Sequence, residues 1–322
     1  MSRYRSALPQ LGDRLFLADG GLETTLIFHF GVELPDFASY HMLRSAEGEA
    51  TLREYFREYA AIARRYEMGL ILDTVTWRAS GDWVQGRGFS DEESARLHAR
   101  SVALLEELRE EFAPVPTVIS GAMGPRGDGY VPGALMLPRH AEAYHQAQVD
   151  ALAAAGADML CAMTINYGEE AIGIAWAARR AAMPLAVSFT VETDGRLPTG
   201  QSLATAIDLV DGATGGYPIY YMVNCAHPTH FAHLLDPAQP WVRRIRGLRA
   251  NASCMSHAEL NESAVLDIGD PADLGRSYAT LKQRLPQLTV LGGCCGTDKR
   301  HVESIAAACA GAMASSCSPS LR

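Results

Sequence analysis

The feature that most constrains the fold is an alternation of strand-like and helix-like segments that repeats eight times along the 322 residues. Each repeat begins with a short β-branched and apolar run, typical of a buried strand, and most continue into a longer segment with helix-capping residues. The expected strands are residues 15–18, 69–75, 116–120, 158–162, 185–189, 217–223, 246–250 and 288–291. The seventh has the weakest pattern, because Arg246 and Arg249 interrupt its apolar run.

Helices are expected between and after these strands. The predicted helices are residues 46–66, 90–112, 138–155, 169–182, 202–211, 270–285 and 298–314, with a further helix beginning at Pro228. Eight alternations without a break in composition predict an α/β protein that forms a single (β/α)8 barrel, the TIM barrel. We therefore expect one domain over residues 1–322, with its core at about residues 12–312 and a frayed tail at residues 314–322.

The composition is that of an ordinary soluble globular protein, with 48% hydrophobic and 20% charged residues. The formal net charge is −9 and no block of lysine or arginine stands out, which argues against nucleic acid or an anionic membrane as a partner. The N-terminus lacks the apolar run of a signal peptide, and no apolar stretch is long enough to span a membrane. The seven cysteines, an odd number at uneven spacing, favour reduced thiols and a cytoplasmic location.

Three cysteines are expected to meet at one end of the barrel. Cys294 and Cys295 follow the predicted strand at residues 288–291, and Cys225 follows the one at residues 217–223. Because the carboxyl ends of parallel strands share one face of a barrel, these thiols should converge. Three thiolates suit zinc and leave a fourth position open, the pattern of a catalytic site. Two other interpretations stay open: small buried core residues, or a strained disulfide between the adjacent Cys294 and Cys295.

The motifs around these cysteines resemble those of the homocysteine S-methyltransferase family. They are Ala-Asp-Gly-Gly-Leu-Glu-Thr at residues 18–24, Asn-Cys at 224–225 and Gly-Gly-Cys-Cys-Gly-Thr at 292–297, supported by Gly-Ala-Met-Gly-Pro at 121–125 and Val-Ser-Phe-Thr at 187–190. The resemblance covers about residues 12–312. It implies a (β/α)8 barrel that binds zinc through Cys225, Cys294 and Cys295, and a place in methionine biosynthesis.

Four further residues at predicted strand ends are candidate substrate-binding residues: Asp19, Met163, Thr164 and Asn224. The resemblance implies that Asp19, in the Asp-Gly-Gly motif, helps hold the amino group of the homocysteine acceptor. Asn224 is expected either to orient its loop or to hydrogen-bond to the polar end of the acceptor. Glu23 is expected to be a carboxylate of a first helical turn.

Met163 departs from the family pattern. Family members commonly carry glutamate-threonine at the end of the fourth strand, where the glutamate is a second anchor for the amino group, whereas this sequence has Met163 and Thr164. Methionine cannot pair with an ammonium group. Glu169 or Glu170 could replace the glutamate from the start of the following helix, but we expect both to face solvent in its first turn. Either homocysteine binds weakly or the acceptor is another thiol with a less polar end beside Met163, and we favour the second.

Histidines and aromatic residues near these strand ends are weaker candidates. His227, His230 and His233 have metal-binding side chains, but a helix that begins at Pro228 would carry them to different faces. Trp77, Trp83 and Tyr130 follow the second and third strands, where they would either stack on a cationic donor or pack over the barrel end.

These observations predict a zinc-dependent S-methyltransferase with a small-molecule thiol acceptor and a small-molecule methyl donor as partners. Zinc would hold the acceptor as a thiolate, which attacks a methyl group on a positively charged sulfur or nitrogen. Because no cobalamin- or folate-binding module follows the barrel, we expect S-methylmethionine or S-adenosylmethionine as the onium donor. The alternatives are a zinc- or ligand-binding barrel without methyl transfer, and a thiol redox enzyme that uses Cys294 and Cys295. The sequence does not indicate the oligomeric state.

Overall fold

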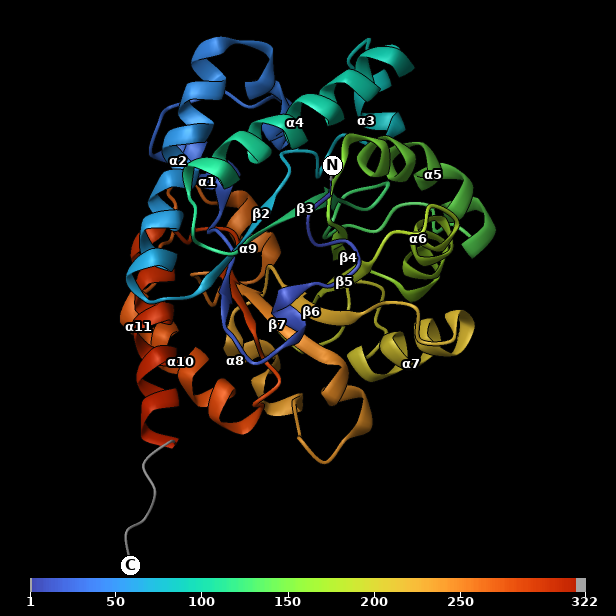
Figure 1. Ribbon diagram of the computed structural model, residues 1–322. Coiled ribbons are helices and arrows are strands. Elements are labelled where there is room, and N and C mark those ends of the chain that lie inside the picture. Colours follow the sequence, from blue (N-terminus) through green and yellow to red (C-terminus); the bar gives the residue numbers. More distant parts are fainter. Residues whose placement is uncertain (1, 317–322) are drawn as a thin grey trace, which may run out of the picture.

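Eight parallel strands close into a barrel in the computed structural model, which describes residues 2–316 (Figure 1). Each strand pairs with the next along the chain, and the last pairs with the first. The strands are β1 (Phe16–Leu17), β2 (Gly69–Asp73), β3 (Thr117–Met123), β4 (Met159–Ile165), β5 (Leu185–Thr190), β6 (Tyr220–Asn224), β7 (Ile245–Ala250) and β8 (Val290–Gly293). The predicted (β/α)8 barrel is therefore confirmed.

Helices surround the barrel on its outside (Figure 1). They are α1 (Leu22–Phe28), α2 (Ala46–Arg65), α3 (Gly81–Gln85), α4 (Asp91–Glu111), α5 (Pro138–Ala155), α6 (Gly168–Arg180), α7 (Leu203–Thr214), α8 (Pro228–Phe231), α9 (His257–Glu262), α10 (Pro271–Arg284) and α11 (Lys299–Ser316). As the sequence indicated, Ser90 caps α4, and Glu93 completes a capping box with it. The predicted tail lies mostly in residues 317–322, outside the described residues, as does Cys317.

The interior of the barrel is built in layers, because alternate residues of each strand point inward. One apolar layer comes from the even-numbered strands and consists of Ile71, Cys161, Met222 and Val290. Two residues further along the same strands, the next inward layer consists of Asp73, Met163, Asn224 and Gly292. The interior therefore changes from apolar to polar towards the carboxyl ends of the strands.

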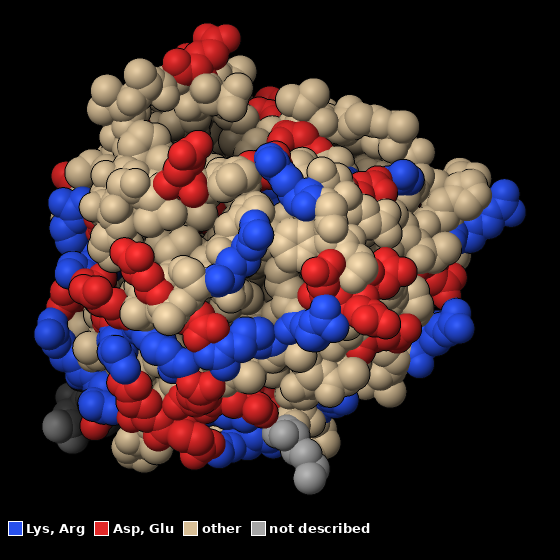
Figure 2. Space-filling model, turned by 90° about the horizontal axis from the view of Figure 1, so that it is seen from above, with Lys and Arg blue, Asp and Glu red and all other residues tan. Residues whose placement is uncertain are grey.

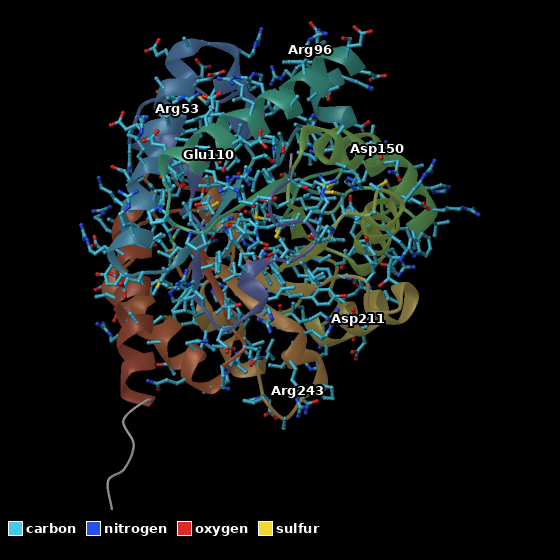
Figure 3. The ribbon with its side chains drawn as sticks, in the orientation of Figure 1. Arg53, Arg96, Glu110, Asp150, Asp211 and Arg243 are labelled. Atoms are coloured by element: carbon cyan, nitrogen blue, oxygen red, sulfur yellow. A yellow bond between two sulfur atoms is a disulfide. The ribbon has the colours of Figure 1, made fainter. Side chains whose placement is uncertain are left out.

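The helices pack on the barrel through a larger apolar cluster and present charged side chains to the outside. Figure 2 shows acidic and basic side chains interspersed over one face, in keeping with the absence of a lysine or arginine block in the sequence. Figure 3 shows charged side chains such as Arg53 on α2 and Asp211 on α7 at the periphery, away from the barrel axis. No helix in residues 2–316 is both long and apolar enough to cross a membrane.

Candidate metal centre

Three cysteine sulfur atoms meet at the carboxyl ends of β6 and β8. The ligand atoms of Cys225, Cys294 and Cys295 all lie within 4.8 Å of one another, and no other such group of cysteine, histidine or carboxylate side chains occurs in the described part of the chain. Two zinc–sulfur bonds of about 2.3 Å can bridge sulfur atoms up to about 4.6 Å apart. The sulfur set therefore fits zinc after a small side-chain adjustment, with the fourth position left for another ligand.

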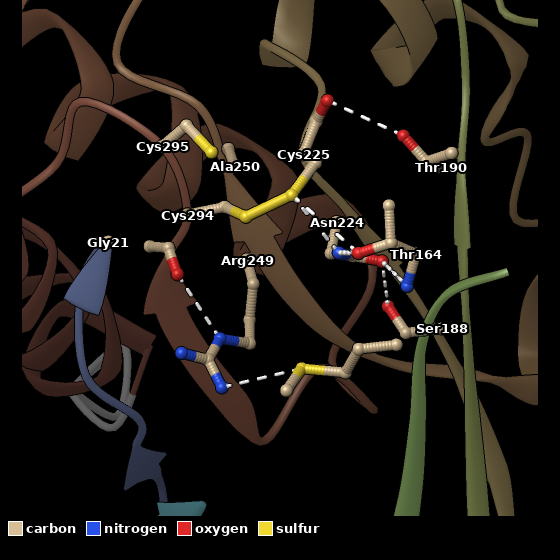
Figure 4. The surroundings of a disulfide bond; sticks show 12 residues. Gly21, Thr164, Ser188, Thr190, Asn224, Cys225, Arg249, Ala250, Cys294 and Cys295 are labelled. Atoms are coloured by element: carbon tan, nitrogen blue, oxygen red, sulfur yellow. Dashed lines mark hydrogen bonds between the residues drawn. A yellow bond between two sulfur atoms is a disulfide. The ribbon is translucent and has the colours of Figure 1, made fainter. Parts of the chain in front are cut away.

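Cys225 and Cys294 are joined by a disulfide in this structure, with their Cα atoms 5.3 Å apart (Figure 4). The expectation that all thiols of the chain are reduced is therefore wrong for Cys225 and Cys294. The count and spacing of cysteines could not show that these two side chains, at the ends of β6 and β8 on either side of β7, touch each other. The alternative of a disulfide between adjacent Cys294 and Cys295 is wrong, because Cys295 is a free thiol. Zinc requires Cys225 and Cys294 as thiolates, so metal binding and the disulfide exclude each other.

Glycine-rich motifs from both ends of the chain form the wall behind the cysteines. The amide of Gly21 donates to the carbonyl oxygen of Thr297 at 2.9 Å, and the amide of Gly293 donates to that of Asp19 at 2.8 Å. A Cβ atom on Gly21 would lie 2.6 Å from the carbonyl oxygen of Cys294, and one on Gly293 would lie 2.0 Å from the hydroxyl of Thr297. Only glycine allows this approach, which explains why both motifs are rich in it.

Asn224 holds the backbone beside Cys225. Its Oδ1 accepts hydrogen bonds from the amide of Thr164 at 3.0 Å and the hydroxyl of Ser188 at 2.7 Å. Its Nδ2 donates to the hydroxyl of Thr164 at 2.8 Å and to the sulfur of Cys225 at 3.3 Å. Thr164 and Cys225 both have positive φ angles, 61° and 52°, a conformation that is uncommon outside glycine. Every donor and acceptor of this amide is thus used to orient the two strand ends (Figure 4).

His257, the first residue of α9, contacts the same site and was not anticipated from the sequence. Its Nε2 lies 2.5 Å from the carbonyl oxygen of Cys225, and its Nδ1 lies 3.0 Å from a carboxylate oxygen of Glu192. Its ring packs against that of Tyr130 at an angle of 32°, with centroids 4.0 Å apart, and the hydroxyl of Tyr130 lies 3.9 Å from the sulfur of Cys295. His257 and Tyr130 therefore connect two of the three cysteines from outside the sulfur cluster.

The three histidines considered as ligands do not join the sulfur cluster. His227 caps the short helix α8 through Thr229. The ring of His230 lies 2.9 Å from the carbonyl oxygen of Cys254, and His233 is exposed.

A pocket opens beside the sulfur atoms. The four predicted substrate-binding residues line it, namely Asp19, Met163, Thr164 and Asn224, together with the three cysteines. Glu23, Asp73 and Arg249 also line it, and the sequence analysis did not place them there. Glu23 does lie in the first turn of α1, as expected, and it accepts a hydrogen bond from Ser39 at 2.8 Å.

Arg249 forms the centre of a buried ion cluster in this pocket. Its guanidinium donates to carboxylate oxygens of both Asp19 and Asp73, and to the carbonyl oxygen of Gly293 at 3.1 Å. Burial opposes its charge, but the two aspartates outweigh burial and raise the pKa of the guanidinium above its usual value. Burial raises the pKa of Asp19 to about 6, although the positive charge of Arg249 acts to lower it. The signal in the sequence is Arg249 itself, a charged residue at an inward position of a strand.

Of the three aromatic residues considered in the sequence, two line the pocket and one does not. Trp77 and Tyr130 line the pocket, and the indole nitrogen of Trp77 donates to the carbonyl oxygen of Met163 at 3.1 Å. The guanidinium of Arg78 lies 4.9 Å from the ring centre of Trp77 and 4.4 Å from that of Trp83. An internal cation therefore already lies against both indoles.

Glu170 corrects another expectation. Its side chain is buried rather than solvent-facing, because it accepts hydrogen bonds from the amide of Arg126 at 2.8 Å and pairs with His145 at 2.9 Å. It contributes nothing to the lining of the pocket.

Comparison with known proteins gives a family match and similar barrel structures. A sequence model of the homocysteine S-methyltransferase family matches residues 16–309. The structure is similar to that of the homocysteine methyltransferase MmuM from Escherichia coli in its oxidized form, with a TM-score of 0.73, 23% identity, and coverage of 95% of this chain and 99% of that one. The metallated form of MmuM gives a TM-score of 0.72 and 20% identity, with 94% and 98% of the two chains covered. The comparison with curated proteins gave no match.

Proposed function

Because the chain belongs to the homocysteine S-methyltransferase family, we propose that this methyltransferase moves a methyl group from an onium donor to a small thiol. The acceptor is homocysteine or a related thiol, and the donor is S-methylmethionine or S-adenosylmethionine. The observation that carries the proposal is the convergence of Cys225, Cys294 and Cys295, whose ligand atoms lie within 4.8 Å of one another beside a pocket.

Cys225, Cys294 and Cys295 would hold zinc once the disulfide is reduced. An unbound thiol has a pKa of about 8.5 and is mostly protonated at neutral pH, and zinc, when bound, supplies the positive charge that favours the thiolate. The reaction forms a bond between the acceptor sulfur and the methyl carbon, breaks the bond between that carbon and the donor, and leaves the donor neutral. Positive charge on the donor therefore disappears as the methyl group moves.

Residues around the sulfur atoms support this chemistry by position and charge. Asn224 donates to the sulfur of Cys225, which favours the thiolate form of that ligand. Burial raises the pKa of Cys295 to about 11, and the charge of Glu23 contributes to the same shift. The pocket is thus a poor environment for an isolated thiolate and suits one whose charge is offset by a metal ion.

Glu23 is a pocket carboxylate whose negative charge affects one of the metal-binding thiols, Cys295. One of its oxygens accepts from Ser39, it is only partly buried, and its charge is felt at Cys295. Burial raises the pKa of this carboxyl group above its usual value. A partly desolvated carboxylate attracts a cation strongly, so Glu23 supports binding of a positively charged methyl donor near the cysteines.

The test is a matrix of thiols against onium donors with the reduced, zinc-loaded protein, scored by the mass of the methylated product. Cys225→Ala should lower the zinc content sharply and abolish turnover. Cys254→Ser is the matched control, because Cys254 is exposed and lies outside the sulfur cluster. Full zinc occupancy in Cys225→Ala, or no methylated product from any pair, would contradict the proposal.

A further inference from the structure

The inner end of the pocket is a layer of side chains across the top of the barrel interior. Asp73, Met163 and Asn224 occupy the inward positions directly above the apolar layer of β2, β4 and β6. Asn224 donates to the sulfur of Cys225 at 3.3 Å, so this layer begins directly beside the metal-binding cysteines. The layer and the cysteines line the same pocket. An acceptor whose sulfur lies at the cysteines therefore extends its far end over this layer.

Most polar groups at this end of the pocket are already paired within the protein. The side-chain amide of Asn224 uses its oxygen and its nitrogen to hold the ends of neighbouring strands. Asp19 uses one oxygen for Arg249 and the other for the hydroxyl of Tyr55 at 3.1 Å. The guanidinium of Arg249 is shared between Asp19 and Asp73. These groups therefore have little left to offer a ligand.

Asp73 is the exception in this layer. One of its oxygens accepts from Arg249, while its Oδ1 has no hydrogen-bond partner among the described residues. The side chain is only 10% exposed and lines the pocket, and Oδ1 is buried away from solvent. A buried carboxylate oxygen without a donor is costly, and a ligand that brings a donor to it removes that cost.

The charge of the pocket favours a cationic group at this oxygen. The described residues that line the pocket include three carboxylates, Asp19, Glu23 and Asp73, and one cation, Arg249. The charge of Glu23 affects Cys295, which places this carboxylate on the metal side, where the onium donor is proposed to bind. Asp73 lies at the inner end instead. A carboxylate shared between a guanidinium and an ammonium group uses both oxygens in charge-assisted hydrogen bonds, which a hydroxyl group cannot match.

We infer that the acceptor carries a primary ammonium group at its far end, and that Asp73 binds this group through Oδ1. This inference rests on the proposed methyl transfer to a thiol and specifies the acceptor as an aminothiol. Met163 lines the same end of the pocket, and its flexible thioether supplies apolar contact to the carbon chain between the thiol and the ammonium group. Position 163 by itself favoured a less polar far end, because the sequence did not show that Asp73 brings a carboxylate to this place from another strand.

The first test compares thiols that differ only at the far end. The pair 3-aminopropane-1-thiol and 3-mercaptopropan-1-ol, with its two-carbon and four-carbon homologues, is assayed with one donor and the reduced, zinc-loaded protein. An ammonium group also lowers the pKa of its own thiol, so the deciding quantity is the change between proteins in the ratio of kcat/KM for amine to alcohol. Asp73→Asn should lower this ratio at least about tenfold at the preferred chain length, because a charge-assisted hydrogen bond is lost. An unchanged ratio at every chain length would overturn the inference.

Two further variants separate this role from a general effect of charge or folding. Asp211→Asn is the matched control, because Asp211 also pairs with an arginine, Arg244 at 2.7 Å, but lies at the periphery (Figure 3). The ratio should not change in this control. Asp19→Asn removes the same charge from the buried cluster, but both oxygens of Asp19 are already occupied, so the ratio should fall less than in Asp73→Asn. An equal fall in Asp211→Asn, or a larger fall in Asp19→Asn, would overturn the assignment to Asp73.

A binding measurement on the wild-type protein needs no variant and separates the inference from the proposed function. Calorimetry with the zinc-loaded protein, without donor, compares 3-(methylthio)propan-1-amine with 3-(methylthio)propan-1-ol, two thioethers that have no thiol to ionise. The amine should bind at least about tenfold more tightly. If it does but no thiol is methylated, the proposed function fails and the inference stands. If thiols are methylated but the two thioethers bind equally, the inference fails and the proposed function stands.

Discussion

Arg249→Met alone should destabilise the protein strongly, because it removes the guanidinium that pairs with two buried carboxylates, Asp19 and Asp73. The side chains of Arg249, Asp19 and Asp73 are 7%, 6% and 10% exposed, so water cannot replace the lost partner. Removing one partner of a buried ion pair typically costs about 3–5 kcal/mol. For a chain of 322 residues, with an unfolding entropy of about 2.1 cal/mol/K per residue, the melting temperature should fall by about 4–7 °C.

The destabilisation should depend on pH, and the direction of this dependence follows from the raised pKa of Asp19. Its pKa is raised to about 6 in the folded protein, above the value of about 3.9 expected in the unfolded chain. Its contribution to stability is therefore greatest below about pH 4 and is lost as the pH rises through about 6. Without Arg249 the folded pKa of Asp19 should rise further, so the variant should lose still more stability between pH 5 and pH 8.

Urea unfolding of both proteins at pH 5 and pH 8, followed by circular dichroism, measures this difference. The free energy of unfolding should differ by about 3–5 kcal/mol at pH 8 and by clearly less at pH 5, where Asp19 is largely protonated in both proteins. Arg57→Met is the control, because Arg57 and Glu111 are 51% and 44% exposed and such a surface pair contributes only about 0–1 kcal/mol. A difference of the same size at both pH values would refute the argument that buried, ionised carboxylates are responsible.

Three further predictions concern the metal and the donor. Glu23→Gln should raise the KM of the cationic donor about tenfold, with a smaller effect on the KM of the thiol, and an unchanged donor KM would contradict the role of Glu23. His257→Asn should weaken zinc binding about 10–100-fold in a chelator competition, as loss of an outer hydrogen bond does at other metal sites; the exposed His233→Asn should not. The oxidised protein should take up no zinc until a thiol reductant is added, because two of the three ligands are joined in the disulfide; equal zinc uptake with and without reductant would speak against the cysteine site.

Local signals in the sequence were sufficient for the barrel. The predicted helix at residues 138–155 has the observed bounds of α5, because Pro138 begins it and the left-handed Gly156 ends it. Short helices are harder to predict from the sequence, because α1, α3 and α9 have five to seven residues and too few turns for a periodic pattern. Because α9 was not predicted, His257 at its start was not recognised as a site residue. His257 reaches the carbonyl oxygen of Cys225 because the segment after β7 folds back over this end of the barrel.

Side-chain contacts between strands that are distant in the sequence could not be predicted from local signals. The convergence of the cysteines was predicted because each follows a strand, and a barrel brings strand ends together. The disulfide, by contrast, depends on two particular side chains meeting over the end of β7, which separates their strands β6 and β8. The cluster of Asp19, Asp73 and Arg249 likewise unites three strands, and nothing near any one of them in the sequence indicates the other two.

The same cluster gives a physical reason for methionine at position 163. The sulfur of Met163 lies 3.7 Å from Arg249, so a glutamate at this position would place a third carboxylate beside one guanidinium. Arg249 already donates to Asp19, Asp73 and Gly293, and a further buried negative charge would lack a full partner of its own. A neutral, flexible thioether avoids that penalty and packs against the guanidinium. Positions 163 and 73 should therefore be coupled through Arg249, such that Met163→Glu is better tolerated with Asp73→Asn than alone.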